Sequence, residues 1–190
     1  SGLFSIGHDA LRCDNFAAAV EFENEPAGEL ALDGQWPLQT DSVAAGELAI
    51  RLRGGQFASP IVRAFANSLD DTATAWLDAV ELRGAFDASG SAYATGDGEA
   101  YFSGALSPRS ISVARRGVRT TFDQVQGRIT FGPEGGRVES LAASCEQWSF
   151  TADGNWTRLP QAGLDLNFSV ESAGLNESLV ALLPDAVGDT

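Results

Sequence analysis

The side chains that most often carry catalysis are sparse in this sequence. His8 is the only histidine, so it alone could act as the imidazole base that activates a serine or cysteine nucleophile. Asp9 follows it directly, and adjacent residues of a strand point to opposite faces, so the two cannot form a dyad without a turn. We therefore interpret His8 as an exposed surface side chain.

The two cysteines do not form a metal-binding pattern either. Cys13 and Cys145 lie far apart in the chain and neither belongs to a Cys-x-x-Cys pair. A zinc site needs three or four ligands, which one histidine and two distant cysteines do not supply. No metal site and no cofactor is therefore predicted.

Carboxylates are abundant, but their arrangement does not point to a reaction. A count of 26 acidic residues is compatible with a glycosidase pair. No pattern, however, places Glu21, Glu23, Glu25, Asp87 or Asp97 in a shared cleft, and solvated acids are the better reading. The segments around Asp87 and Asp97 are typical of turns and lack the ligand spacing of a calcium-binding loop. The sequence thus predicts a protein that is not an enzyme.

The strongest pattern is an alternation of apolar and polar residues, which is clearest near the C-terminus. Leu164, Leu166, Phe168 and Val170 share one face of a predicted strand, and the residues between them are polar. The same period-two pattern gives two further groups of candidate groove-lining residues: Ile129 and Phe131, and Leu48, Ile50 and Leu52. These nine residues are the candidate apolar surface of the chain, because each row of such side chains is stabilised by being shielded from water. Alternation alone does not distinguish such a groove from the closed core of a sandwich.

Other segments complete a mainly β prediction of roughly a dozen strands. Residues 3–23 read as one long strand or as two strands broken at Asp14-Asn15. A loop or weak hairpin is predicted for residues 87–98, a strand for 148–152 that closes at Asp153-Gly154, and a strand with a kink at Gly127 for 122–131. Two or three short amphipathic helices are predicted, after Ser59-Pro60, after Asp70-Asp71 and from Asn176 to Pro184. Strands at this spacing, with turns between them, indicate an antiparallel sheet.

Composition narrows the classes of partner. The net charge is −14, which argues against nucleic acid and against adsorption to anionic lipid surfaces, since both require a basic surface. All twelve basic residues are arginine, and their one local cluster is Arg115, Arg116 and Arg119. On a strand these three would be spread over both faces, so we interpret them as a solvated edge. The chain begins Ser-Gly without Met, and we expect it to be a piece of a longer or processed protein.

Similar segments recur in the same order along the chain. Cys13-Asp-Asn-Phe16 matches Cys145-Glu-Gln-Trp148, and Gly34-Gln-Trp36 matches Gly154-Asn-Trp156. The strand beginning at Gly46 matches the one beginning at Gly163, with an offset of one residue. We therefore predict one domain over 1–190 that contains the end of one repeat (about 1–80) and a full second repeat (about 81–184). If the repeats lie side by side, the two cysteines are several strands apart and form unpaired, largely buried thiols, unless closure of the sheet brings them together.

Four segments also carry a family resemblance: Phe122-Asp-Gln-Val-Gln-Gly-Arg-Ile-Thr-Phe131, Val138-Glu-Ser-Leu141, Asp153-Gly-Asn-Trp156 and the strand-then-helix Leu164–Pro184. This pattern resembles the AsmA/TamB-like family of bacterial envelope proteins. The resemblance implies a curved, elongated antiparallel sheet, folded like a taco or a partly open half-barrel around an apolar groove. It also implies a periplasmic location, with an inner-membrane anchor outside this fragment. The family has no catalytic motif, and this chain departs from it in its strongly acidic balance and in showing no anchor.

The function implied by this resemblance is the binding and conduction of phospholipid, or another acyl-chain lipid, between the inner and outer membranes. An outer-membrane protein is the implied protein partner, and outer-membrane biogenesis is the implied process. A second hypothesis is a carbohydrate-binding or adhesive extracellular β-sandwich, in which Trp36, Trp148 and Trp156 stack on sugars. A third is a structural spacer whose length is set by its repeats. Plain core packing of the tryptophans competes with the second hypothesis.

Overall fold

The described part of the chain consists almost entirely of β-strands. A computed structural model describes residues 2–22, 25–38, 46–57, 81–94, 100–145, 148–157, 163–172 and Gly174. The strands in these ranges are β1 (Leu3–Ile6), β2 (Ala10–Phe22), β3 (Glu25–Pro37), β4 (Gly46–Gln56), β5 (Glu81–Arg83), β6 (Ala85–Ala94), β7 (Ala100–Pro108), β8 (Ile111–Arg115), β9 (Val118–Phe122), β10 (Gln124–Gly132), β11 (Gly135–Ser144), β12 (Trp148–Thr157) and β13 (Gly163–Ser172). The predicted mainly β class is confirmed.

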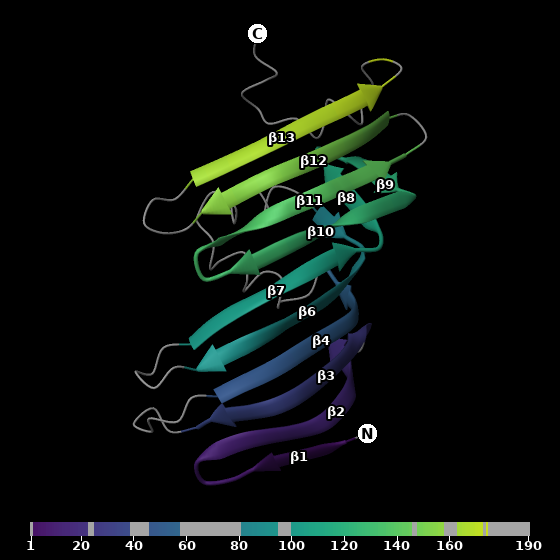
Figure 1. The fold of residues 1–190 in the computed structure, drawn as a ribbon. Helices are drawn as coiled ribbons and strands as arrows, with labels where there is room; N and C mark the ends of the chain where they lie inside the picture. Colours follow the sequence, from purple (N-terminus) through teal and green to yellow (C-terminus); the bar gives the residue numbers. More distant parts are fainter. Residues whose placement is uncertain are drawn as a thin grey trace.

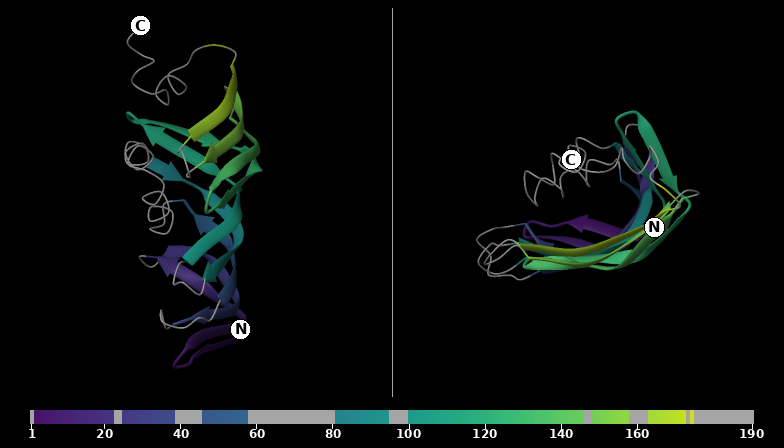
Figure 2. Two further views of the ribbon diagram at one scale, coloured as in Figure 1. Left: turned by 60° about the vertical axis from the view of Figure 1, so that its left-hand side comes forward. Right: turned by 90° about the horizontal axis from the view of Figure 1, so that it is seen from above.

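Ten of these strands form one antiparallel sheet, in the spatial order β1-β2-β3-β4-β6-β7-β10-β11-β12-β13 (Figure 1). Neighbours in space are mostly neighbours in sequence, as in a meander. Seen from above, the sheet is an arc with a concave and a convex face, and its first and last strands do not meet (Figure 2). The prediction of a large antiparallel sheet that is not closed is confirmed.

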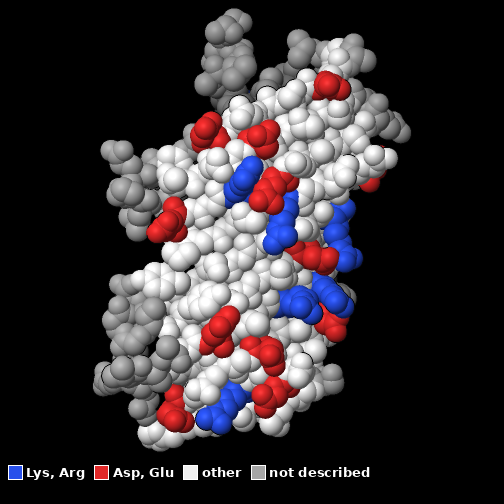
Figure 3. All heavy atoms as spheres, in the orientation of Figure 1, with Lys and Arg blue, Asp and Glu red and all other residues white. Residues whose placement is uncertain are grey.

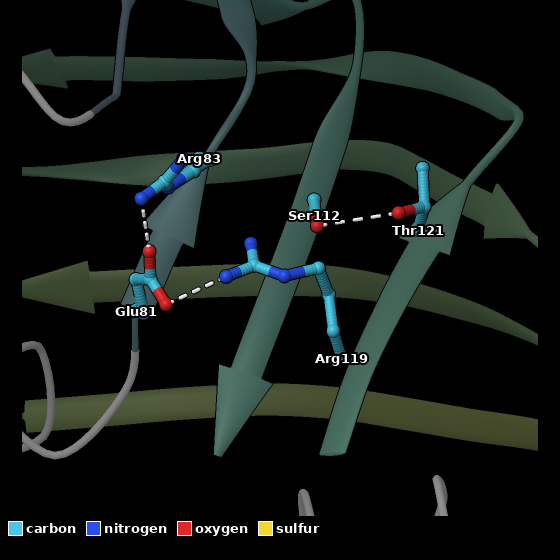
Figure 4. Close-up of polar contacts among 5 residues, drawn as sticks. All are labelled: Glu81, Arg83, Ser112, Arg119 and Thr121. Atoms are coloured by element: carbon cyan, nitrogen blue, oxygen red, sulfur yellow. Dashed lines mark hydrogen bonds and ion pairs between the residues drawn. The ribbon is translucent and has the colours of Figure 1, made fainter. Parts of the chain in front are cut away.

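A second, three-stranded sheet was not predicted. It has the order β5-β8-β9 and lies over the concave side of the large sheet, whose strands it crosses steeply (Figures 2 and 4). Val113 of β8 and Phe122 of β9 pack there against Ala143 and Trp148 of the large sheet. These four side chains are the buried apolar cluster that joins the two sheets.

The predicted helices cannot be compared with the structure, because they fall on residues 58–80 and 175–190, outside the described ranges. Within those ranges the structure contains no helix.

Two sequence predictions about the extent of strands are wrong. Residues 87–94, expected in a loop or weak hairpin, belong to β6, where small residues allow close pairing and Gly90 lies opposite Gly104 of β7. The strand expected to close at Asp153-Gly154 instead continues to Thr157, because Gly154 adopts a φ of 150° that keeps it within β12.

Two further predictions need correction. The chain between residues 3 and 22 is interrupted at Gly7–Asp9, between β1 and β2, whereas Asp14-Asn15 forms a bulge inside β2. Arg116 does not lie on a strand: Arg116 and Gly117, with φ of 53° and 79°, make the turn between β8 and β9. The kink expected at Gly127 is confirmed as a bulge, with a φ of 132°.

The bulges show which strands of the proposed repeat correspond. Asn15 of β2 and Ser140 of β11 both have a φ of 48°. Each lies beside a bulge opposite a positive-φ glycine, Gly34 of β3 and Gly154 of β12 respectively. The matches of Gly34 with Gly154 and of Trp36 with Trp156 therefore agree with the geometry.

The matched cysteines do not agree with it. Cys13 pairs with Gly34 inside β2, and its geometric counterpart, the residue that pairs with Gly154, is Val138. Cys145 lies in the connection after β11. The expectation that the two cysteines hold equivalent positions in the repeats is therefore wrong, because similarity of sequence does not take the strand register into account. The division into repeats near residue 80 stays a prediction.

Candidate functional site: the apolar concave face

All nine predicted groove residues lie on the same face of the ten-stranded sheet. Directly paired residues on neighbouring strands point to the same face, so the register can be followed from strand to strand. One row consists, in spatial order, of Phe16, Leu32, Ile50, Gly90, Gly104, Phe131, Gly136, Trp156 and Leu164. The next consists of Ala18, Leu30, Leu52, Ala88, Leu106, Ile129, Val138, Gly154 and Leu166. Leu48, Phe168 and Val170 pair with Ala92, Ala152 and Phe150 on the same face.

This apolar face is the concave one. Figure 3 shows the opposite face, on which acidic and basic side chains are scattered, and Figure 2 shows that this charged face is the convex side of the arc. The alternation along β4 accounts for the division, since Arg51 and Arg53 point away from Ile50 and Leu52. The sheet therefore curves around its apolar side chains.

The nine residues differ in how far they are covered. Leu48 is only 9% exposed, and Ile50, Leu52, Ile129, Phe131 and Val170 are half-buried. On β13, in contrast, Leu166 is 45% and Phe168 is 62% exposed. The side chain of Leu164 lies outside what the structure describes. Large exposed apolar side chains in one region of a surface are typical of a binding surface.

The small sheet closes only part of this face. Phe122 contacts Trp148 and Phe150 edge to face, with ring centroids 5.1 and 5.3 Å apart, and Val170 packs at the border of the same cluster. Phe150 in turn stacks on the exposed Phe168, with centroids 5.5 Å apart. The aromatic side chains thus run from a closed core to an accessible edge, and the sandwich-core alternative is correct at that core.

Glycines in the rows make room for aromatic side chains, two of which, Trp156 and Phe102, were not among the predicted groove residues. A Cβ on Gly136 would lie 2.1 Å from the indole of Trp156, so this ring covers the glycine backbone. Phe131 covers Gly104 in the same way, with 3.2 Å to a Cβ there, and contacts Phe102 at a centroid distance of 5.4 Å. Trp156 and Phe102 belong to the apolar face, and their alternation with polar neighbours could have revealed this.

Among the described residues, His8, Cys13 and Cys145, which were considered as base, nucleophile or metal ligands, lie at three separate places in the fold. His8 is exposed, in the connection between β1 and β2, as expected. Among the described residues there is no group of three metal-binding side chains.

Both cysteines are unpaired, which confirms the prediction of two free thiols. Cys13 is fully buried, and burial, with the charges of Asp14 and Asp33, raises the pKa of its thiol. Cys145 is half-buried, and its thiol donates to the carbonyl of Trp148 at 3.3 Å.

The polar contacts of the small sheet are on its outer side and are structural. Glu81 of β5 is bound by Arg83 at 2.5 Å and by Arg119 of β9 at 2.7 Å, and Ser112 meets Thr121 at 3.3 Å (Figure 4). Burial acts to raise the pKa of Glu81, but the two guanidinium groups outweigh it and lower this pKa. The contact of Glu81 with Arg119 joins β5 to β9 across β8, which lies between them.

Comparison with family models, with curated proteins and with solved structures finds no match to this chain. Over the described residues, no helix has both the length and the apolar character needed to span a membrane.

Proposed function

We propose that this chain is a non-catalytic segment of a bacterial envelope protein whose concave face binds the acyl chains of phospholipids. In this proposal the segment lies in the periplasm, and lipid moves along the face between the inner and outer membranes. An inner-membrane anchor and an outer-membrane partner protein belong to the same proposal. The observation that supports it is the pair of rows that cross nine of the ten strands, from β2 to β13, without a charged residue.

The length of the rows fits the transport of a chain-like ligand. Eight steps between the nine strands from β2 to β13, at about 4.8 Å each, give about 38 Å. One leaflet of a bilayer has a hydrocarbon depth of roughly 15 Å, half of the usual thickness of about 30 Å. An acyl chain lying along the rows would therefore cover about two fifths of their length and would meet similar surface beyond its end.

The energetics favour movement over tight retention. Shielding apolar surface from water contributes about 25 cal/mol per Å², whichever aliphatic side chain provides the contact. Neighbouring positions in a row, such as Leu52, Leu106 and Ile129, thus offer comparable free energies. A surface of this kind holds lipid without a single deep minimum, which is what conduction requires.

Phe168→Asp is the variant that tests the proposal. It introduces a charge at an exposed position of the apolar face, and we expect co-purified phospholipid to fall several-fold, measured by native mass spectrometry and by lipid extraction. Ser169→Asp is the matched control, because it adds the same charge to the same strand on the convex face and should leave the lipid content unchanged.

Two outcomes would contradict the proposal. One is a wild-type protein without bound lipid that also fails to take up phospholipid from vesicles. The other is equal loss in both variants. If Phe168→Asp instead lowers the midpoint of urea unfolding strongly, the side chain belongs to a core and not to a binding surface.

A carbohydrate-binding function is favoured by one separate observation. Tyr93 and Tyr101 lie opposite each other on the convex face and are 38% and 36% exposed, and exposed aromatic rings are suited to stacking on sugars. Binding to a glycan array that is lost in Tyr93→Ala but retained in Phe168→Asp would favour this function over lipid binding.

A further inference from the structure

The convex face contains a group of arginines that the sequence does not reveal. Arg51 and Arg53 lie on β4 and Arg128 on β10, and the three line one depression of about 230 Å³. Figure 3 shows most of the basic side chains of this face over its middle, with acidic side chains spread toward both ends. The remaining lining residues are Leu52, Asp87, Ala88, Ser89, Ala105 and Ser107.

Small side chains of β6 and β7 form the base of the depression, and arginines of β4 and β10 lie on its two sides. Ser89 of β6 and Ala105 of β7 are directly paired and, with Ser107, form the floor. The strands on either side, β4 and β10, are three steps apart, or about 14 Å at roughly 4.8 Å per step. Arginine side chains are long enough to reach inward from both strands, so their guanidinium groups can meet on one group above the floor.

The acid at this site is already neutralised within the protein. Arg109 donates its Nε–H to Oδ2 of Asp87 at 2.7 Å and forms an ion pair with it, and the backbone N–H of Gly54 donates to Oδ1 at 2.9 Å. Burial acts to raise the pKa of Asp87, but the bond from Gly54 and the charges of Arg109 and Arg53 lower it overall. Asp87 therefore stays ionised and bound at neutral pH.

The three lining arginines have no such partner in the described part of the chain. Among the described residues, none of the three arginines forms an ion pair. Two carboxylates lie on the next strands outward: Glu29 of β3 is opposite Arg53, and Glu139 of β11 is opposite Arg128. Guanidinium groups that face one depression repel each other, and a bound anion would relieve this repulsion.

We propose that this depression binds a phosphate group, as a phosphate ion or as the monoester or diester of a small molecule. The planar fork of a guanidinium group matches two phosphate oxygens, and the hydroxyl groups of Ser89 and Ser107 are further donors on the floor. The acidic remainder of the chain, with its net charge of −14, disfavours a long polyanion, so the site selects a single small anionic group. It lies on the convex face and is independent of what the concave face binds.

Titration with inorganic phosphate, followed by NMR chemical shifts, tests the site directly. We expect saturable shifts at Ser89 and Ser107 that weaken as sodium chloride is added. Arg53→Gln should weaken binding about fivefold, which corresponds to roughly 1 kcal/mol for an exposed charge. Arg137→Gln removes the same charge from β11 on the same face, outside this depression, and should change the affinity less than twofold.

The result is interpretable because these arginines are exposed and both variants should keep the unfolding midpoint of the wild type. The proposal is overturned if the wild type shows no saturable binding, or if the two variants weaken it equally. Co-sedimentation with phosphatidylcholine vesicles, with and without phosphatidic acid, identifies the source of the phosphate. Binding that requires both phosphatidic acid and Arg53 assigns a lipid headgroup, and phosphate binding without vesicle binding assigns a soluble ligand.

Discussion

Two buried polar atoms at the contact between the sheets lack a hydrogen-bond partner in the described structure. They are Oγ1 of Thr120, on the inner side of β9, and Nε1 of Trp148, at the start of β12. The residues are only 5% and 6% exposed. A buried polar group without a partner costs about 1–3 kcal/mol, so this contact contains avoidable instability.

Thr120→Val should therefore stabilise the protein. Valine has nearly the shape of threonine and removes the unsatisfied hydroxyl group, and we expect the free energy of unfolding to rise by about 1 kcal/mol, measured by urea denaturation. Thr121→Val is the control, because Thr121 points outward and bonds Ser112 at 3.3 Å, so its replacement should bring no gain. A decrease for Thr120→Val would mean that the hydroxyl group has a partner in the folded protein.

Single residues also show what the sequence could and could not predict about the sites. The nine apolar positions were found because each alternates with polar neighbours along its own strand. The phosphate site was not found, because Arg51 and Arg128 lie 77 positions apart in the chain and meet only through the pairing of β4, β6, β7 and β10. Local patterns report faces of strands, whereas contacts across strands depend on register.

At the scale of strands, one carboxylate adds a side-chain link between β4, β6 and the end of β7, beside their backbone pairing. Asp87 of β6 joins Gly54 of β4 to Arg109, which follows β7. These partners lower the pKa of Asp87 in the folded protein from its ordinary value of 3.8, although burial opposes them. The stabilisation is therefore fully present above that ordinary value and is lost as the pH falls through the lower folded pKa.

Asp87→Asn should show this dependence on pH. At about pH 6 we expect the variant to be less stable than the wild type by about 1 kcal/mol or less, since Arg109 is largely exposed. As the pH falls below 3.8 the difference in urea midpoint should shrink, because a growing fraction of Asp87 is protonated and no longer attracts Arg109. Asp165→Asn on β13 should show no difference at any of these pH values. A difference that stays constant across this range would exclude the ionic explanation.

The strands that were missed share a physical reason. β6 contains Ala, Ser and Gly at most positions, so it has little contrast in hydrophobicity, and its strand structure comes from close pairing with β4 and β7. The three-stranded sheet joins β5 to the β8–β9 hairpin across 27 intervening residues, from Gly84 to Ser110. No local pattern encodes that pairing.

At the scale of the whole molecule, net charge and exposed apolar surface have opposite effects on self-association. A net charge of −14 at pH 7 keeps copies apart although the concave face exposes large apolar side chains. Near the isoelectric point of about 4.2 this repulsion disappears. We expect reversible self-association there, measured by light scattering between about pH 7 and pH 4. A protein that stays monomeric throughout would show that its apolar side chains are not available to a second copy.

The direction of the apolar rows has a further consequence. The rows run from strand to strand, so the reach of the molecule depends on how many strands it has, whereas the width available to a guest depends on how long each strand is. Adding or removing one hairpin of the β6–β7 type would change the reach by about 10 Å, two steps of roughly 4.8 Å, and leave the width unaltered. Evolution can thus adjust the distance spanned and the cargo accepted separately.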